Sequence, residues 1–311
     1  MKKIIAIVGP TASGKTSLSI ALAKALDGEI ISCDSMQIYR GMDIGTAKPT
    51  AEEMDGVPHH LIDIADTSEN FSAADYAPRA KAAIEDIFSR GKLPIFCGGT
   101  GLYLDSVVRA KAFEASEPEP EYREYLWKMA EEEGGVDRLH EMLLEVDPVS
   151  AEAIHKNNVK RVIRALEIYR SAGVPKSVLD EKSKATESEY DVRAIGLRYS
   201  DRDVLYERIN KRVDIMVSDG LLSEVERLYG DGALKDSYTA SQAIGYKEFL
   251  AYLRGEMSLE GAIEELKRAT RRYAKRQMTW FSARDYVTFI DAQEKDLETL
   301  VREAMEIINK N

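Results

Sequence analysis

A segment near the start of the 311-residue chain has the residue types that bind phosphate. It reads Gly9-Pro-Thr-Ala-Ser-Gly-Lys-Thr16 and fits the pattern G-x-x-x-x-G-K-[ST] at every fixed position. Its glycines let the backbone curl so that successive N–H groups face an anion, and a following helix adds partial positive charge. Lys15 supplies a full charge, and Thr16 supplies a hydroxyl that can hold Mg²⁺. We therefore predict a loop that binds two linked phosphates, of a nucleotide or of another diphosphate ester, whereas a glycine-rich turn without a ligand is the alternative. This P-loop is formed by Gly9, Pro10, Thr11, Ala12, Ser13, Gly14, Lys15 and Thr16.

Two further groups of polar residues follow predicted strands, where ligands of parallel sheets collect. The first is Asp34-Ser-Met-Gln-Ile-Tyr39, in which Asp34 can accept a proton or help to hold Mg²⁺. Capping of a helix is the alternative for this aspartate. The second is Gly98-Gly-Thr-Gly-Leu-Tyr103, in which Thr100 offers a hydroxyl to a phosphate oxygen. An ordinary strand-to-helix turn explains that segment equally well.

A third group follows a later strand. Asp201 has the position of a helix N-cap, and Arg208 and Arg212 lie four residues apart on one helical face. Either arginine can reach a diphosphate. For Arg208 and for Lys211, an ion pair with Glu207 or Asp214 on a solvated surface is the alternative.

The elements that must position these groups are readable from the apolar pattern. A continuous apolar run, as in Ile4 to Val8, is typical of a buried parallel strand, and helical periodicity follows the P-loop. The alternation predicts an α/β fold with a doubly wound, P-loop NTPase-like parallel sheet. The predicted strands are Ile4–Val8, Glu29–Cys33, Leu93–Cys97 and Val192–Leu197, and the predicted helices include Ser17–Leu26, Ala73–Arg90 and those from Asp201 to Tyr229 and beyond.

A change of composition divides the chain. Glu114-Ala-Ser-Glu-Pro-Glu-Pro-Glu121 is rich in proline and acid, as linkers are, and amphipathic helices follow it to about Leu179. We expect a catalytic core made of residues 1–113 and 190–311, with C-terminal helices that bind nucleic acid. Residues 114–189 are expected to form an inserted helical subdomain.

Bulk composition excludes several classes of protein. With 44% hydrophobic and 31% charged residues the chain is globular, and its first apolar run is too short for a signal peptide or a membrane span. We expect a monomer in the cytoplasm without a membrane partner. Cys33 and Cys97 lack the spacing of a disulfide framework or a zinc site, so both are expected to be reduced packing residues. The adjacent His59 and His60 would point in different directions and are not expected to bind a metal.

The net charge of −11 argues against a nucleic-acid partner, but the charges are unevenly distributed. Eight glutamates lie between Glu114 and Glu133, whereas residues 267–276 hold six bases and no acid. On a helix these six bases occupy one half of the circumference, and a second basic face lies opposite the inward-packing Val162, Leu166 and Tyr169. The second face comprises Lys160, Arg161 and Arg164. A solvated surface is the alternative for either face.

Taken together, five segments resemble those of bacterial tRNA dimethylallyltransferases, and the resemblance spans nearly the whole chain. They are the P-loop, Asp34-Ser-Met-Gln-Ile-Tyr39, Gly98-Gly-Thr-Gly-Leu-Tyr103, Arg161-Val-Ile-Arg-Ala-Leu-Glu167 and Gln277-Met-Thr-Trp280. This resemblance implies Mg²⁺-dependent transfer of a dimethylallyl group from its diphosphate to the exocyclic amine of the adenine 3′ of the anticodon. It also implies that Asp34 is the general base, that Thr100 contacts the bridging oxygen or the reacting region, and that Lys15 and Arg212 hold the diphosphate.

The same resemblance points to residues that contact the tRNA anticodon stem-loop. Gln242-Ala-Ile-Gly-Tyr-Lys247 also has groups able to stack on or hydrogen-bond an unpaired base. Many relatives have Gln-Arg where this chain has Lys160-Arg161, which leaves a base-specific contact there in question. Pairing with nearby glutamates is the alternative for Arg123. The expected RNA-binding residues are Asp34, Ser35, Met36, Gln37, Thr100, Arg123, Lys160, Arg161, Arg164, Gln242, Gly245, Tyr246, Lys247, Lys275 and Arg276.

Three other functions use the same residues. In a small-molecule kinase the P-loop would hold ATP and Asp34 would activate an acceptor hydroxyl. An adenylate isopentenyltransferase would share the catalytic groups but needs no RNA surface. A P-loop protein that binds RNA as a switch or adaptor would not need the carboxylate of Asp34 at all.

Overall fold

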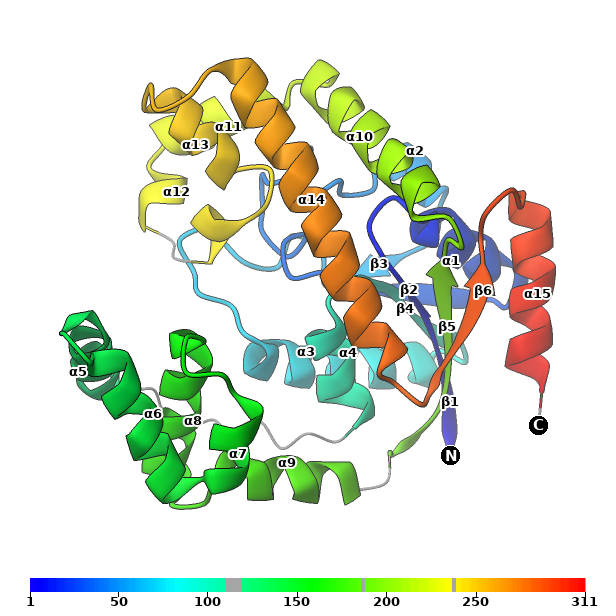
Figure 1. The fold of residues 1–311 in the computed structure, drawn as a ribbon. Coiled ribbons are helices and arrows are strands. Elements are labelled where there is room, and N and C mark those ends of the chain that lie inside the picture. The colour runs from blue at the N-terminus through cyan, green and yellow to red at the C-terminus, as the bar shows by residue number, and fades with distance from the viewer. Residues whose placement is uncertain (110–118, 186–187, 237–238, 311) are drawn as a thin grey trace. The chain divides into compact units, whose positions relative to one another are not determined.

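The computed structural model describes residues 1–109, 119–185, 188–236 and 239–310 and divides the chain into two compact units (Figure 1). The first unit comprises Met1–Val107 and Glu189–Asn311, and the second comprises Val108–Ser188. The predicted boundary between residues 113 and 114 lies outside the described residues. The predicted boundary between residues 189 and 190 lies one residue from the observed edge of the second unit.

The first unit is built on a parallel sheet of six strands in the order β3-β2-β4-β1-β5-β6. The predicted α/β fold with a parallel sheet is therefore confirmed. Four of the strands agree with the predicted runs, whereas β3 and β6 were not predicted. The strands are β1 (Lys2–Val8), β2 (Gly28–Ser32), β3 (His59–His60), β4 (Leu93–Gly98), β5 (Tyr190–Arg198) and β6 (Val287–Asp291).

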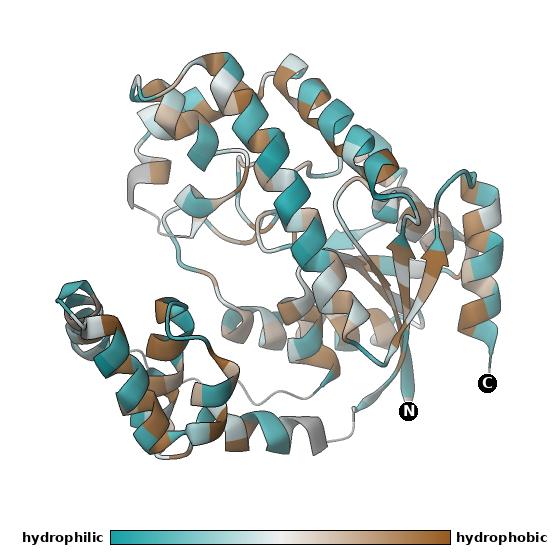
Figure 2. Cartoon of the chain, in the orientation of Figure 1, coloured by the Kyte–Doolittle hydropathy of each residue, from teal (hydrophilic) through white to brown (hydrophobic). Residues whose placement is uncertain are grey.

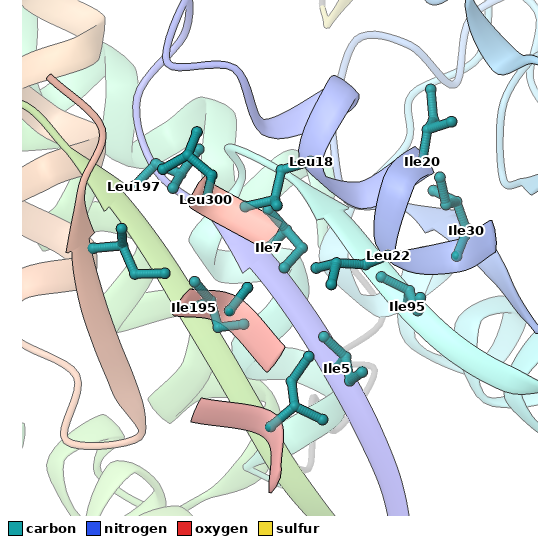
Figure 3. Close-up of a cluster of buried hydrophobic side chains, with 14 of the residues drawn as sticks. Ile5, Ile7, Leu18, Ile20, Leu22, Ile30, Ile95, Ile195, Leu197 and Leu300 are labelled. Atoms are coloured by element: carbon teal, nitrogen blue, oxygen red, sulfur yellow. The ribbon is translucent and has the colours of Figure 1, made fainter. Parts of the chain in front are cut away.

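The strands at the centre of the sheet are hydrophobic because helices cover both of their faces, as Figure 2 shows by colour. Successive side chains alternate between the faces. Ile5, Ile7 and Ile195 pack against α1 (Lys15–Ala25) and α15 (Leu297–Asn309) in the cluster drawn in Figure 3. Helix α3 (Ala73–Ser89) contacts β2 and β4. Each fully buried Ile or Leu of this core stabilises the fold by about 1.5–3 kcal/mol.

The remaining helices of the first unit follow the carboxyl ends of the strands. Among them α10 and α14 pack together, and α13 packs on α14. Asp201 accepts a hydrogen bond from the N–H of Asp203, which confirms it as the N-cap of α10. These helices are α2 (Ala51–Met54), α4 (Gly101–Val108), α10 (Arg202–Ser218), α11 (Leu221–Gly230), α12 (Ala233–Asp236), the 3₁₀ helix η1 (Ala240–Gln242), α13 (Lys247–Leu253) and α14 (Leu259–Ser282).

The second unit is helical, and its amphipathic helices bury a core of their own around Leu126, Leu143 and Val162. Of the predicted linker, residues 114–118 lie outside the described residues, and Pro120 already begins a helix. Tyr169 was expected to pack inward, but its side chain is exposed. The helices are α5 (Pro120–Glu131), α6 (Gly135–Val146), α7 (Pro148–Ala153), α8 (Val159–Ala172) and α9 (Lys176–Ala185). None of the helices in the described parts of the chain has the length and apolar character needed to cross a bilayer.

Candidate active site

The P-loop links the end of β1 to the start of α1. Gly14 has φ 93° and occupies the N-cap, so α1 begins at Lys15, two residues before the predicted start. Gly9 has φ 137°, and a Cβ there would lie 2.6 Å from the carbonyl oxygen of Leu197, so only glycine fits. The Nζ of Lys15 donates to the carbonyl oxygen of Pro10 at 2.6 Å, across the curl of the loop. The backbone N–H groups at the start of α1 are thus arranged to receive an anion.

A cavity of about 330 Å³ opens beside the P-loop and gathers side chains from across the first unit. The structure brings together eleven of the predicted site residues here, from the P-loop, the segment after β2, helices α10, α13 and α14, and the 3₁₀ helix η1. Predicted site residues that line the cavity are Thr11, Lys15, Thr16, Asp34, Ser35, Met36, Gln37, Arg212, Gln242, Lys247 and Arg276. A second, more open cavity of about 890 Å³ shares Lys15, Thr16 and Arg212 with the first.

Burial of three charged groups makes the first cavity suited to a ligand with strong negative charge. The pKa of Lys15 is lowered to about 8, chiefly by burial and also by the charge of Arg212, while Cys97 and Asp34 act in the opposite direction. Burial also lowers the pKa of Arg212, and the negative charges of Glu53 and Asp34 act in the opposite direction. The pKa of Asp34 is raised above its ordinary value by the same burial, although a hydrogen bond from the N–H of Met36 and the charge of Lys15 act against the shift. An anion between Lys15 and Arg212 would compensate both cations.

Asp34 lies in a loop between β2 and α2, and its Oδ1 accepts the N–H of Met36 at 2.9 Å. No helix begins there, so the alternative that Asp34 is a helix cap is wrong. Its carboxylate shares the cavity with Lys15 and Thr16. The carboxylate is therefore placed where it can accept a proton from a group that enters the cavity.

Thr100 connects two of the loops around the cavity. Its Oγ1 accepts the N–H of Ser35 at 3.0 Å, and its own N–H donates to the carbonyl of Cys33 at 3.0 Å. The hydroxyl of Tyr273 lies beside the side chains of Thr100 and Gln277. Thr100 is absent from the lining of the first cavity, so its predicted contact with a bridging oxygen stays a prediction.

A loop at residues 43–47, which the sequence did not mark as functional, forms another wall of the cavity. The carboxylate of Glu224, on α11, accepts the N–H groups of Asp43, Ile44 and Gly45 at 2.9, 2.9 and 3.0 Å. It also accepts the hydroxyl of Tyr246 at 2.7 Å. Tyr246 is fully buried, which corrects the expectation that its ring stacks on an RNA base.

The chain is similar to known proteins over most of its length. A model of the IPP transferase family matches residues 37–284. A tRNA dimethylallyltransferase from Caldanaerobacter subterraneus is 52% identical over 292 residues, which cover 93% of this chain and 92% of that protein. One from Bacillus cereus is 54% identical over 293 residues, which cover 94% and 91%.

The chain belongs to the IPP transferase family. The resemblance that its motifs suggested is thereby confirmed. The crystal structure of a full-length tRNA isopentenylpyrophosphate transferase from Bacillus halodurans matches with a TM-score of 0.73 at 50% identity, covering 99% of this chain and 95% of that one. A eukaryotic dimethylallyltransferase acting on tRNA matches with a TM-score of 0.81 at 34% identity, covering 94% of this chain and 75% of that one.

In this member of the IPP transferase family the six bases of α14 do not form one exposed face. Lys267 pairs with Asp214 at 2.8 Å, and Arg271 donates to Asn210 at 2.6 Å, so both bases turn toward α10. The four others are exposed: Arg268, Arg272, Lys275 and Arg276. The predicted stripe of six is therefore a stripe of four, because two of the bases hold α14 to its neighbour.

Arg208 also has an internal partner. Its Nε donates to the carbonyl oxygen of Ala12 at 3.0 Å, and its guanidinium lies over the ring of Tyr199. The alternative was an ion pair of Arg208 with Glu207 or Asp214 on a solvated surface, whereas the contacts found are with Ala12 and Tyr199. Arg208 thus supports the P-loop from α10, one turn before Arg212.

In the second unit the predicted basic residues lie on α5 and α8. Arg123 pairs with Glu167, its Nη2 donating to Oε2 at 2.9 Å, and Arg164 lies 3.5 Å from the same carboxylate. This partner is a buried glutamate of α8, which agrees with the alternative that Arg123 pairs with a glutamate. Lys160, Arg161 and Arg164 are exposed.

Proposed function

We propose that this chain transfers a dimethylallyl group from dimethylallyl diphosphate to the exocyclic N6 amine of the adenine 3′ of the tRNA anticodon, releasing diphosphate. The observation that supports this proposal best is the single cavity that contains Lys15, Arg212 and Asp34. Two cations and a P-loop suit a diphosphate leaving group, and the carboxylate suits a proton acceptor. Membership of the IPP transferase family supports the same reaction.

The chemistry follows from the weakness of the nucleophile. The lone pair of an adenine amine is delocalised into the ring, so the enzyme must stabilise the leaving group and remove a proton. The bond between the allylic carbon and the bridging oxygen breaks while the bond from that carbon to N6 forms. The proton leaves N6 for the carboxylate of Asp34, and Lys15 and Arg212 hold the diphosphate. Each such donor is worth about 3–4 kcal/mol of transition-state stabilisation.

The residues present fit a Mg²⁺ ion beside the diphosphate. The Thr16 hydroxyl and the Asp34 carboxylate line the same cavity, and Mg²⁺ is usually held by one or two protein oxygens together with phosphate oxygens. When bound, the ion would neutralise charge that develops on the diphosphate. Thr16 is its proposed protein ligand.

The exposed bases supply the surface for RNA. Lys275 and Arg276 lie on α14, and Arg276 also lines the cavity, so phosphate contacts and the reacting base can be reached from one helix. Lys160, Arg161 and Arg164 offer further phosphate contacts from the inserted unit, and Gln242, Gly245 and Lys247 lie on the segment that adjoins the cavity. The adenine must leave its stack, at a cost of a few kcal/mol that is smaller in an RNA loop. We expect this reaction to take place in the cytoplasm with a monomeric enzyme.

The test incubates purified protein with dimethylallyl diphosphate, Mg²⁺ and an unmodified anticodon stem-loop, and weighs the RNA for an added five-carbon unit. We predict this gain for the wild type and loss of most of it in Lys15→Ala and Arg212→Ala, because each substitution removes a cation from the leaving group. AMP in place of RNA tests the adenylate alternative. Phosphate transfer from labelled ATP, with no gain on RNA, would establish the kinase instead.

A further inference from the structure

Gln277 on α14 has no part in the proposed reaction, yet it occupies the junction of two active-site loops. Its side chain is 4% exposed. Its Oε1 accepts the backbone N–H of Thr11 at 2.9 Å, and its Nε2 donates to the carbonyl oxygen of Gly99 at 3.2 Å. One amide therefore joins the P-loop to the loop that follows β4.

The loop after β4 is shaped to receive this amide. A Cβ added to Gly99 would lie 1.9 Å from Nε2 and 3.1 Å from Cδ of Gln277. The φ of Gly99 is outside the positive range, so its backbone conformation does not require glycine. Glycine is required at position 99 because the side-chain amide of Gln277 occupies the space that a Cβ would need.

The connection continues from Gly99 to the proposed base. Thr100, the next residue, accepts the N–H of Ser35 at 3.0 Å, and Ser35 directly follows Asp34. On the other side, the P-loop carries Lys15. Gln277 thus stands between the residues that hold the leaving group and the residue that takes the proton.

We propose that Gln277 is a positioning residue, which fixes the P-loop relative to the loops of Thr100 and Asp34 and so aligns the donor carbon with the amine. The inference rests on the proposed function. Gln277 also lines the cavity beside the hydroxyl of Tyr273, but both of its polar atoms are bonded to backbone, which ties its side chain to Thr11 and Gly99. A misplacement of about 1 Å can lower a rate about 10²-fold. Loss of the Gln277 amide should therefore lower the rate of the chemical step and leave the affinity for RNA nearly unchanged.

The first experiment measures kcat and KM in the stem-loop assay for Gln277→Met, which keeps the length of the side chain and removes both hydrogen bonds. We expect kcat to fall about 10²-fold, with KM for RNA within threefold of wild type. The thermal unfolding midpoint should decrease moderately, because the N–H of Thr11 and the carbonyl of Gly99 lose their partner, and the variant should remain folded at the assay temperature. Gln277→Glu keeps the acceptor for Thr11 and should recover part of kcat. The control Gln293→Met, outside the cavity, should match wild type. Wild-type kcat in Gln277→Met would overturn the inference.

The second experiment tests the pair directly. Gly99→Ala alone should lower kcat about as much as Gln277→Met, because the new methyl group collides with Nε2. In a Gln277→Ala background the same change should have little further effect, since the colliding group is gone. An equal further loss in that background would refute the pairing. Failure of the wild type itself to add a five-carbon unit would instead refute the proposed function.

Discussion

At the scale of single residues, the site concentrates groups whose pKa values are shifted by burial. Burial disfavours the charged form of Lys15, Arg212 and Asp34, and the attraction between the carboxylate and the two cations offsets this cost only in part. Lys15 and Asp34 were predictable because the P-loop pattern and the strand-end aspartate are local in the sequence, whereas Arg212 was predicted mainly from the family resemblance. Gln277 and Glu224 were not assigned roles, because their partners lie far away along the chain. Gln277 meets Thr11 across 266 positions, and Glu224 meets Gly45 across 179.

The shift at Lys15 predicts the alkaline limb of the pH profile. Only the protonated amine attracts diphosphate, and its pKa in the free protein is about 8. The kcat/KM for dimethylallyl diphosphate should thus fall as pH rises past that value, by about tenfold per unit well above it. On the acid side, kcat/KM should rise as Asp34 loses its proton, at a pH above the ordinary range of an aspartate.

A matched variant separates the two limbs of this profile. Arginine stays charged at all accessible pH values, so Lys15→Arg should lose the alkaline limb and keep the acid limb, even at lower absolute activity. An unchanged alkaline limb in this variant would assign it to another group.

At the scale of elements, helices α11 and α14 are hydrogen-bonded to the loops that follow the strands. Glu224 of α11 accepts from the loop at residues 43–47, and Gln277 of α14 bonds to the P-loop and to the loop after β4. The strands β1, β2, β4 and β5 were predictable as apolar runs, whereas β3 is two histidines paired with β2, and β6 is only partly buried. Val287, Phe289 and Ile290 of β6 are typical of a strand and made β6 predictable, whereas the two histidines of β3 have no apolar pattern. The division of the bases on α14 was likewise unpredictable, since Lys267 and Arg271 find partners on α10 that periodicity does not reveal.

The carboxylate of Glu224 accepts three backbone N–H groups of the loop at residues 43–47 and the hydroxyl of Tyr246, and we call this set of hydrogen bonds the Glu224 clamp. The clamp predicts how this loop responds to substitution. Glu224→Gln keeps one acceptor and removes the negative charge, so the free energy of unfolding should fall by about 1.5–3 kcal/mol. Amide hydrogen exchange at Asp43, Ile44 and Gly45 should accelerate. Tyr246→Phe removes only the fourth donor and should cost about 1 kcal/mol, with little change at those amides. Unchanged exchange in Glu224→Gln would contradict the clamp.

At the scale of the whole molecule, an acidic protein presents its exposed bases in local groups. The net charge is −11, yet Arg268, Arg272, Lys275 and Arg276 are exposed along α14, whose ribbon has many hydrophilic positions in Figure 2. The fold class followed from the sequence, and so did eleven of the residues that line the cavity, whereas the loop at residues 43–47 did not. The bases that remain available to RNA could be identified only after the internal ion pairs were known.

The central claim is that the P-loop cradles a diphosphate expelled from carbon, and the fate of the bridging oxygen tests it most directly. Dimethylallyl diphosphate labelled with ¹⁸O at that position is turned over with the anticodon stem-loop, and both products are weighed. We predict that the label is found entirely in the released diphosphate and that the RNA gains an unlabelled five-carbon unit. Label retained on the RNA, or phosphorus transferred to it, would contradict the account.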